Sequence, residues 1–155
     1  MLSDVQKKVL ELIVRRLRGN HIPFQITGGL AAKAYGVKRP LYDIDIDIYK
    51  RDIPRVRKLF KHFIKKDFYH LQVENFDIYL MTLKINGVNV DISQAEESYV
   101  IGKSGIKTKI ETDLSKVELI EIDDLELPIQ NKKVLIKYKK ILSRDVDLED
   151  VTQIR

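Results

Sequence analysis

The residues best suited to chemistry lie in one short segment, where aspartate and isoleucine alternate from Asp43 to Ile48. In an extended strand, residues two positions apart face the same side, so Asp43 and Asp45 would lie about 7 Å apart on one face. Neighbouring carboxylates repel each other, and a divalent cation such as magnesium removes that repulsion. Because aspartate is depleted in strands, this segment favours a metal site over a merely solvated acidic face, which remains the alternative. Asp47 stands in the same relation to Asp45, so the pair that binds metal is open at this point.

A Gly-Gly pair, Gly28 and Gly29, precedes Asp43 by thirteen residues and lies between a predicted strand and a predicted helix. At such a junction, bare backbone N–H groups can approach phosphate oxygens, and the positive end of the helix assists them. A tight turn that needs a positive φ is the simpler explanation of an isolated Gly-Gly. The position just upstream of the aspartates favours phosphate binding.

A third carboxylate, Asp91, lies in a second alternating segment, where Val88, Val90 and Ile92 occupy the other face. If this segment pairs near the first one, Asp91 could bind the same metal or accept the proton of an incoming hydroxyl. Two metal ions held there could stabilise both the attacking and the leaving oxygen of a phosphoryl transfer. An ordinary solvated aspartate is the alternative.

The elements before the aspartates can be read from capping and apolar spacing. Ser3 to Gln6 forms a capping box, and apolar residues at helical spacing follow it until Gly19 and Asn20. Residues 22–27 fit a buried strand, residues 30–35 favour a helix, and residues 42–49 alternate as a strand does. The Gly-Gly turn and the aspartates are therefore expected at adjacent ends of these elements.

After the aspartates, Asp52 is expected to cap a long helix whose apolar stripe runs from Ile53 to Ile64 and whose other faces are basic. Asn86-Gly87 predicts a hairpin between strands at 76–85 and 88–93. Short strands are expected at 106–112 and 117–122, a helix from Asn131 onward, and an acidic turn or short helix at 145–154. This order of helices and strands along the chain predicts an α+β fold, in which helices flank a mixed β-sheet, in a single domain spanning residues 1–155.

Composition limits the function classes. The chain has 155 residues, of which 44% are apolar, so a compact core is expected. It has no cysteine and three scattered histidines, which disfavours thiolate or histidine metal sites and excludes a cysteine nucleophile. No apolar run approaches the ~20 residues that span a bilayer, so a cytoplasmic protein without membrane contact is expected. The net charge of +5 favours anionic partners such as nucleotides or nucleic acid.

The segment ITGGLAAKAYGVKRPLYDIDI resembles the polymerase-beta-like nucleotidyltransferase superfamily. It is most similar to the subgroup in which thirteen residues separate Gly-Gly from Asp-x-Asp. That subgroup includes AbiEii-type toxins of toxin–antitoxin systems and lincosamide-type antibiotic nucleotidyltransferases. Arg39 fits the family pattern Arg-x-Thr-x-Asp-x-Asp, with Leu41 in place of threonine. The C-terminal segment VLIKYKKILSRDVDLEDV resembles the family's Tyr-Lys helix followed by Arg-x-x-Asp-x-x-Asp.

The resemblance implies the polymerase-beta-like fold and the transfer of a nucleoside monophosphate from an NTP to an acceptor, with release of pyrophosphate. It implies that Asp43 and Asp45 bind two Mg²⁺ ions, and that Asp91 binds the metal nearer the acceptor and helps to activate its hydroxyl. The spacing from the Gly-Gly pair favours Asp43 with Asp45 over Asp45 with Asp47.

The resemblance also implies nucleotide-binding roles. Gly28 and Gly29 would cradle the triphosphate, although the family more often has Gly-Ser, so that backbone N–H groups must act alone here. Lys139 would neutralise phosphate charge, or it would be an ordinary surface charge. Arg39 would also neutralise phosphate charge, or it would pair with an aspartate. Tyr138 is expected in the core. A local ion-pair network is the favoured role for three further residues: Arg144, Asp147 and Asp150.

The acceptor is left open by the sequence. The first hypothesis is RNA, such as tRNA, or a protein hydroxyl, with the basic helix at 53–66 as a candidate acceptor surface; a solvated basic face is the alternative. The second is a small hydroxylated molecule such as an antibiotic, for which 155 residues leave little room unless a homodimer builds the pocket. The third is a catalytically idle binding or antitoxin partner, which the intact Asp-x-Asp disfavours.

Overall fold

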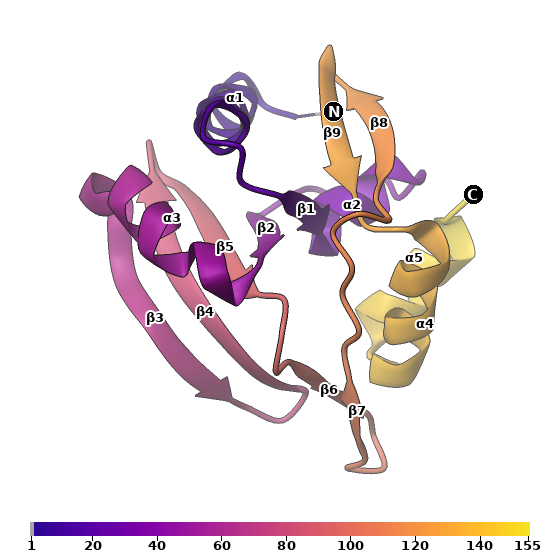
Figure 1. Cartoon of the computed structure of the whole chain (residues 1–155). Helices are drawn as coiled ribbons and strands as arrows, with labels where there is room; N and C mark the ends of the chain where they lie inside the picture. The colour runs from indigo at the N-terminus through magenta and orange to yellow at the C-terminus, as the bar shows by residue number, and fades with distance from the viewer. Residues whose placement is uncertain (1) are drawn as a thin grey trace.

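The computed structural model describes residues 2–155 and contains one mixed β-sheet with helices packed on it (Figure 1). The strands are β1 Phe24–Thr27, β2 Asp43–Ile48, β3 Ile64–Gln72, β4 Phe76–Ile85, β5 Val88–Gln94, β6 Tyr99–Ile101, β7 Lys107–Lys109, β8 Glu118–Ile122 and β9 Leu125–Ile129. The helices are α1 Asp4–Gly19, α2 Gly28–Ala34, α3 Ile53–Leu59, α4 Lys132–Leu142 and α5 Asp145–Gln153, with short 3-10 turns at Lys50–Asp52 and Lys61–Phe63. The α+β class and the mixed sheet are as predicted.

The sheet order is β7-β6-β4-β5-β2-β1-β9-β8, and β3 pairs with β4. The strand pair at its centre, β2 and β5, is parallel, whereas β1 with β2 and β4 with β5 are antiparallel. The central strand β2 is therefore held on both sides, which fixes the direction of every side chain that it carries.

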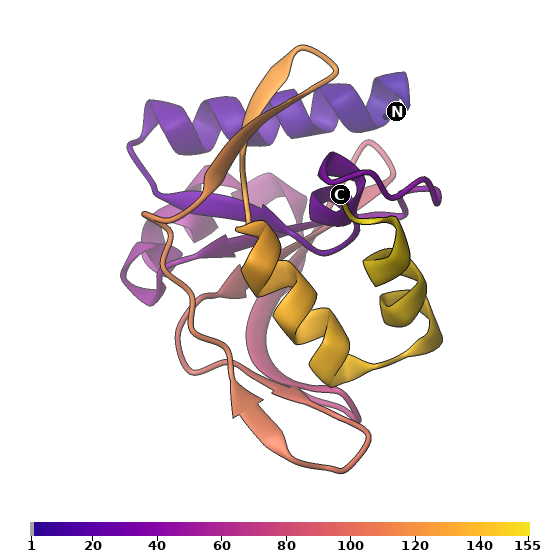
Figure 2. The ribbon, with the colours of Figure 1, turned by 90° about the vertical axis from the view of Figure 1, so that its right-hand side faces the viewer.

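The alternation of aspartate and isoleucine divides β2 into two faces. Ile44, Ile46 and Ile48 are fully buried and belong to the main apolar core. Helices α1 and α3 cover this face, because buried residues of both, such as Leu10 and Val56, belong to the same core. We call the opposite face, which carries the aspartates, the carboxylate face; α4 and α5 lie on that side (Figures 1 and 2).

Local signals explain why several elements form where predicted. The capping box of α1 is present, since Ser3 Oγ accepts from the Gln6 N–H at 3.1 Å and the Gln6 side chain accepts from the Ser3 N–H at 2.9 Å. Asn86 and Gly87 have φ values of 48° and 82°, the positive pair that a type I′ hairpin requires. The Asn131 side chain caps α4. The described residues contain no helix long and apolar enough to cross a membrane.

The long second helix predicted over residues 53–64 is wrong. Helix α3 ends at Leu59, a 3-10 turn follows, and β3 begins at Ile64 and runs along β4. Val56 and Phe60 are buried as the stripe predicted, but strand pairing overrides helical spacing beyond them. Asp52 precedes α3 as expected yet makes no capping hydrogen bond; its buried carboxylate lies near Arg51 and Arg55 instead.

The basic helix proposed as an acceptor surface over 53–66 is therefore also wrong as a single element. Its basic residues are distributed over α3, the 3-10 turn and β3. Helix α3 packs on the isoleucine face, so its cations lie on the other side of the sheet from the aspartates. Only the part of this segment that belongs to β3 can reach the carboxylate face.

Candidate functional site

The strand register brings the predicted metal ligands onto one face. Asp45 of β2 lies directly opposite Asp91 of β5 on one side and opposite Thr27 of β1 on the other. Residues opposite each other on neighbouring strands share a face, and their strands lie about 4.8 Å apart. Asp43 lies two residues along β2 on the same face. The strand register thus places the three aspartates on one face, while their convergence on one metal ion and their roles in catalysis stay predictions.

Burial and repulsion between carboxylates raise the pKa values of Asp45 and Asp91. Burial is the largest cause for Asp45, and repulsion from Asp91, Asp43 and Asp47 adds to it, so that the pKa of Asp45 rises to about 7 although Lys139 lowers it slightly. Burial and the charge of Asp43 also raise the pKa of Asp91. Groups under such repulsion bind a divalent cation favourably, since the cation compensates both the burial and the repulsion.

The donor set fits magnesium in kind, because it consists of carboxylate oxygens beside a cavity that can admit water and phosphate. In the side-chain conformations described for residues 2–155, no three acidic or imidazole groups close around one point. The aspartates therefore share a face but would need side-chain rotation to bind one ion together.

The Gly28–Gly29 turn lies against the carboxylates. Gly28 has a φ of 60°, and a Cβ atom placed there would lie 2.9 Å from Cγ of Asp45 and closer still to Oδ2. Only glycine allows this approach together with this backbone conformation. Thr27, which precedes α2, makes no side-chain capping bond, so the first N–H groups of the turn remain without that partner. The turn is therefore both conformationally required and placed beside the predicted metal ligands.

Three cations form a network with two buried aspartates of α5. Arg39 donates two hydrogen bonds of 2.9 Å to Asp150, and Lys139 Nζ lies 2.8 Å from the same carboxylate. Arg144 Nε lies 2.6 Å from Asp147, and Lys139 lies 3.7 Å from Asp147. The expected ion-pair network of the Arg-x-x-Asp-x-x-Asp segment is present, and it also includes both predicted nucleotide-binding cations.

This network lowers the pKa of Asp150. Burial acts to raise that pKa, but the hydrogen bonds from Arg39 and Lys139 outweigh it. The same carboxylate raises the pKa of Arg39. Two aspartates thus hold three cations, which leaves one excess positive charge beside the cavity.

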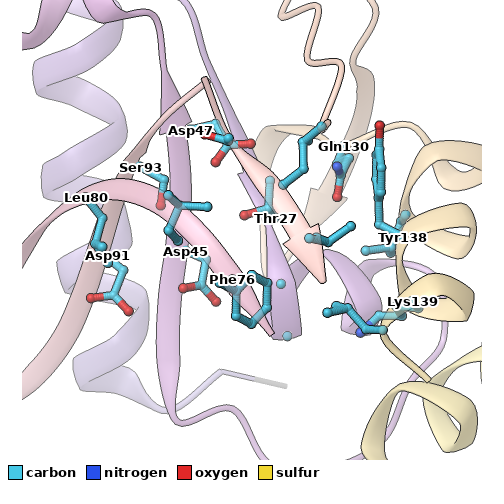
Figure 3. A pocket seen from close by; sticks show the side chains of 18 of the residues that line it. Thr27, Asp45, Asp47, Phe76, Leu80, Asp91, Ser93, Gln130, Tyr138 and Lys139 are labelled. Atoms are coloured by element: carbon cyan, nitrogen blue, oxygen red, sulfur yellow. The ribbon is translucent and has the colours of Figure 1, made fainter. Parts of the chain in front are cut away.

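A cavity of about 540 Å³ joins these parts, a volume suited to one nucleotide-sized ligand. Gly28, Gly29 and the aspartates of β2 and β5 line one side, and Lys139, Arg144 and Asp147 line another. Figure 3 shows Asp45 and Asp91 on neighbouring strands, Tyr138 and Lys139 on α4, and Phe76 between the two groups. Apolar residues also line the cavity, among them Ile78, Leu80, Val100, Leu135 and Leu142, together with polar ones such as Ser93, Thr112 and Gln130.

Asp47 and Tyr138, which also line the cavity, have structural partners. Asp47 accepts a hydrogen bond of 2.8 Å from Gln25 and lies opposite Ser93 rather than a carboxylate, although burial raises its pKa to about 6. This environment favours Asp43 with Asp45 as the metal pair. Tyr138 is buried as expected, and its hydroxyl accepts from the Glu111 N–H at 2.9 Å.

The sequence reasoning missed the apolar wall that β4 and β6 supply, and it missed Gln25 as the partner of Asp47. The β4 wall could have been found, because Phe76, Ile78 and Leu80 alternate along a predicted strand. The link from Asp150 to both Arg39 and Lys139 joins residues up to 111 positions apart, and no local pattern indicates it.

Comparison with known sequences identifies no relative, because no model of a known protein family and no curated protein sequence matches this chain. Solved structures do match. A candidate nucleotidyltransferase from Thermotoga maritima aligns with a TM-score of 0.77 at 22% identity, over 98% of this chain and 93% of its own. The chain has a nucleotidyltransferase fold.

Two further structures of this fold are described as antibiotic-modifying or antibiotic-resistance proteins. ANT(2″)-Ia, in complex with adenylyl-2″-tobramycin, aligns with a TM-score of 0.63 at 14% identity, over 96% of this chain and 86% of its own. The lincosamide antibiotic adenylyltransferase LnuA, lincomycin-bound, aligns with a TM-score of 0.59 at 17% identity, over 97% of each chain. The nucleotidyltransferase fold is as predicted, while the superfamily and its AbiEii-type or lincosamide-type subgroup stay predictions.

Proposed function

We propose that this nucleotidyltransferase-fold protein is a magnesium-dependent enzyme that moves a nucleoside monophosphate from an NTP to a hydroxyl acceptor. The observation that carries the proposal is the register of β2 with β1 and β5, which aligns Asp45 with Asp91 beside the Gly28 turn. A fold alone does not define an activity, but this combination of carboxylates and phosphate-accessible backbone suits phosphoryl transfer.

The proposed reaction forms one bond and breaks one bond. The acceptor oxygen attacks the α-phosphorus of the NTP, a new P–O bond forms, and the bond from this phosphorus to the bridging oxygen of the β-phosphate breaks. Pyrophosphate leaves with that electron pair, and the hydroxyl proton passes to the Asp91 carboxylate.

The other residues act by position and charge. Asp43, Asp45 and Asp91 would hold magnesium, which when bound supplies positive charge to the phosphate oxygens. The backbone N–H groups at Gly28 and Gly29 would donate to the triphosphate. Arg39 and Lys139, oriented by Asp150 at 2.9 and 2.8 Å, would bring positive charge to the β- and γ-phosphates.

The first candidate acceptor is RNA, including tRNA, or a protein hydroxyl. A small hydroxylated molecule is the second candidate, and one observation favours it. LnuA, a lincosamide adenylyltransferase, is covered over 97% of its own chain, so a chain of this extent leaves enough room for a small acceptor. The apolar wall of the cavity is compatible with such a ligand.

The test is incubation of the protein with each α-labelled NTP, Mg²⁺ and total cellular RNA, total protein or a panel of aminoglycosides and lincosamides. Label transfer identifies the donor and the acceptor class together. Asp45→Ala serves as the matched control and is expected to transfer no label while remaining folded. If the unaltered chain binds no NTP in the presence of magnesium, it is an idle binding or antitoxin partner and the enzyme proposal is wrong.

A further inference from the structure

The carboxylate face continues beyond Asp91 onto two more strands. Asp91 lies opposite Thr82 of β4, and Thr82 lies opposite Lys66 of β3. Because opposite residues on neighbouring strands share a face, Lys66 lies on the same face as Asp91. Two strand spacings place the Cα atoms of Lys66 and Asp91 about 10 Å apart. A cation at the edge of the sheet is thus aligned with the proposed proton acceptor.

A second lysine lies in the neighbouring set of cross-strand partners. Lys84 of β4 is opposite Asn89 of β5, which is opposite Asp43 of β2, so Lys84 also belongs to the carboxylate face. Both lysines are exposed. Among the ion pairs of residues 2–155, none involves Lys66 or Lys84. Two lysines without a carboxylate partner therefore lie on the same face as the aspartates, two strands away.

Lys66 is held in place by an aromatic ring. Its Nζ lies 3.7 Å from the ring centroid of Tyr69, a cation–π contact on the same strand. A β-bulge between Lys66 and Tyr69 makes this contact geometrically possible, since it brings both residues onto the carboxylate face. The ammonium group is thereby oriented over the sheet rather than extended freely into solvent.

The site has a donor side and an acceptor side. Gly28 and Gly29, with Arg39 3.5 Å from the Cβ position of Gly29, lie on the β1 side of β2. Asp91, Thr82 and Lys66 lie on the opposite side, across β5, β4 and β3. The β4 wall of the cavity itself is apolar, and Thr82 and Lys66, which continue from Asp91 across β4 and β3, lie outside the cavity. If the triphosphate occupies the glycine side, these residues offer the attacking hydroxyl an approach over β4 and β3. The surface it meets there carries lysines that have no carboxylate partner.

We propose that Lys66 and Lys84 bind phosphate groups next to the terminal ribose of a single-stranded RNA, whose 3′-hydroxyl is the acceptor. The inference rests on the transferase function proposed above and specifies its substrate class. Charge complementarity carries it, because a polyanion is the acceptor that two unpaired ammonium groups beside the attacking hydroxyl would stabilise. The oxygen of that hydroxyl forms the new bond to the α-phosphorus, its proton passes to Asp91, and pyrophosphate leaves.

The experiment measures label transfer from an α-labelled NTP to a single-stranded RNA oligonucleotide in Mg²⁺ buffer, and Mg-NTP binding by calorimetry. Lys66→Glu and Lys84→Glu are compared with Lys8→Glu, an equal charge reversal at an exposed position of α1, on the other side of the sheet. We expect each of the first two variants to lower kcat/KM for RNA roughly ten-fold, through KM. Each should also reduce the slope of log affinity against log salt by about 0.7. Lys8→Glu should behave as the unaltered protein, and all should bind Mg-NTP equally.

The inference is overturned if both reversals on the carboxylate face behave like Lys8→Glu. It is also overturned if protein or a small molecule receives the label and RNA does not, while Mg-NTP binding persists. Loss of Mg-NTP binding by the unaltered chain would instead remove the transferase proposal itself, so the two failures are distinguishable.

Discussion

Aspartates lie on two sides of the cavity, and the two groups have opposite surroundings. Asp43, Asp45 and Asp91 share one face of the sheet, and burial together with repulsion between carboxylates raises the pKa values of Asp45 and Asp91. Asp150, from α5, has Arg39 and Lys139 as hydrogen-bond donors, and its pKa is lowered. The first group costs the fold free energy unless a cation binds, whereas the second stabilises it. We infer that the β2–β5 aspartates are kept for binding and the α5 aspartates for holding cations in place.

Of the substitutions that test this difference between the two groups of aspartates, the one with the largest expected effect lowers activity. Asp45→Asn removes a metal ligand from the centre of the strand row and should lower label transfer about 10³-fold or more. Its free energy of unfolding without divalent ions should be equal to or higher than that of the unaltered chain, because a buried and repelled charge is gone. Denaturant unfolding with EDTA checks this. Strong destabilisation, or activity within ten-fold, would contradict the assignment of Asp45 to the binding group.

The second effect tests how closely the glycine turn and Asp45 are coupled. Gly28→Ala places a Cβ atom 2.9 Å from Cγ of Asp45 at a φ of 60° and should lower transfer roughly 10²-fold. The positive φ should also cost about 1–2 kcal/mol of stability. Gly29→Ala is the matched variant, because its nearest atoms would be 3.4 Å and 3.5 Å away and its backbone N–H is kept.

For Gly29→Ala we expect a stability within roughly 0.5 kcal/mol of the unaltered protein and a smaller loss of transfer than for Gly28→Ala. Thermal unfolding and transfer kinetics on the two variants give the comparison. Equal losses in both would show that contact with Asp45 is not what requires glycine at position 28.

The third effect concerns Asp150, whose carboxylate is paired with two cations. Asp150→Asn leaves Arg39 and Lys139 without their buried counter-charge and should cost about 3–5 kcal/mol of unfolding free energy. Since the native pKa of Asp150 is lowered, its stabilising contribution is complete above the unfolded pKa of about 3.9 and is lost as pH falls through the native pKa. The difference in stability between the unaltered and variant chains should therefore shrink below about pH 4.

Unfolding free energies of both chains, measured between pH 3 and 7, test whether their difference in stability shrinks as the pH falls. The same Asp-to-Asn exchange would thus have opposite consequences at positions 45 and 150. A variant of Asp150 as stable as the unaltered chain at pH 7 would remove the proposed difference between the two groups.

Much of the binding group could be predicted from the sequence because its signals are local. The alternation in β2, the Asn86-Gly87 hairpin and the Gly-Gly turn each lie within a few residues, and strand pairing brings them together. Period-two alternation fixes which side chains share a face, so the carboxylate face could be predicted before its neighbours were known.

The remaining features of the fold and the site depend on contacts between residues that are distant in the sequence. Two register shifts in β3 interrupt its alternation, so residues 64–72 show no strand period, and Ile64 continues the helical stripe of α3 instead. This irregularity produced the wrong helix at 53–64 and hid the position of Lys66 on the carboxylate face. The pairing of Asp150 with Arg39 likewise has no local signature, since the fold alone brings α5 to the residues before β2.

The smallest expected effect decides to which group Asp47 belongs. Asp47 shares the face and spacing of the metal ligands, yet it accepts a hydrogen bond from Gln25 and lies opposite Ser93 rather than an aspartate. Asp47→Asn should therefore lower transfer less than about ten-fold, as expected for a residue outside the metal ligands. Single-turnover transfer measured beside Asp43→Asn provides the comparison, since the spacing from the glycine turn assigns the large loss to Asp43. If the losses are reversed, the metal pair is Asp45 with Asp47, and the bound phosphates would lie nearer to Gln25.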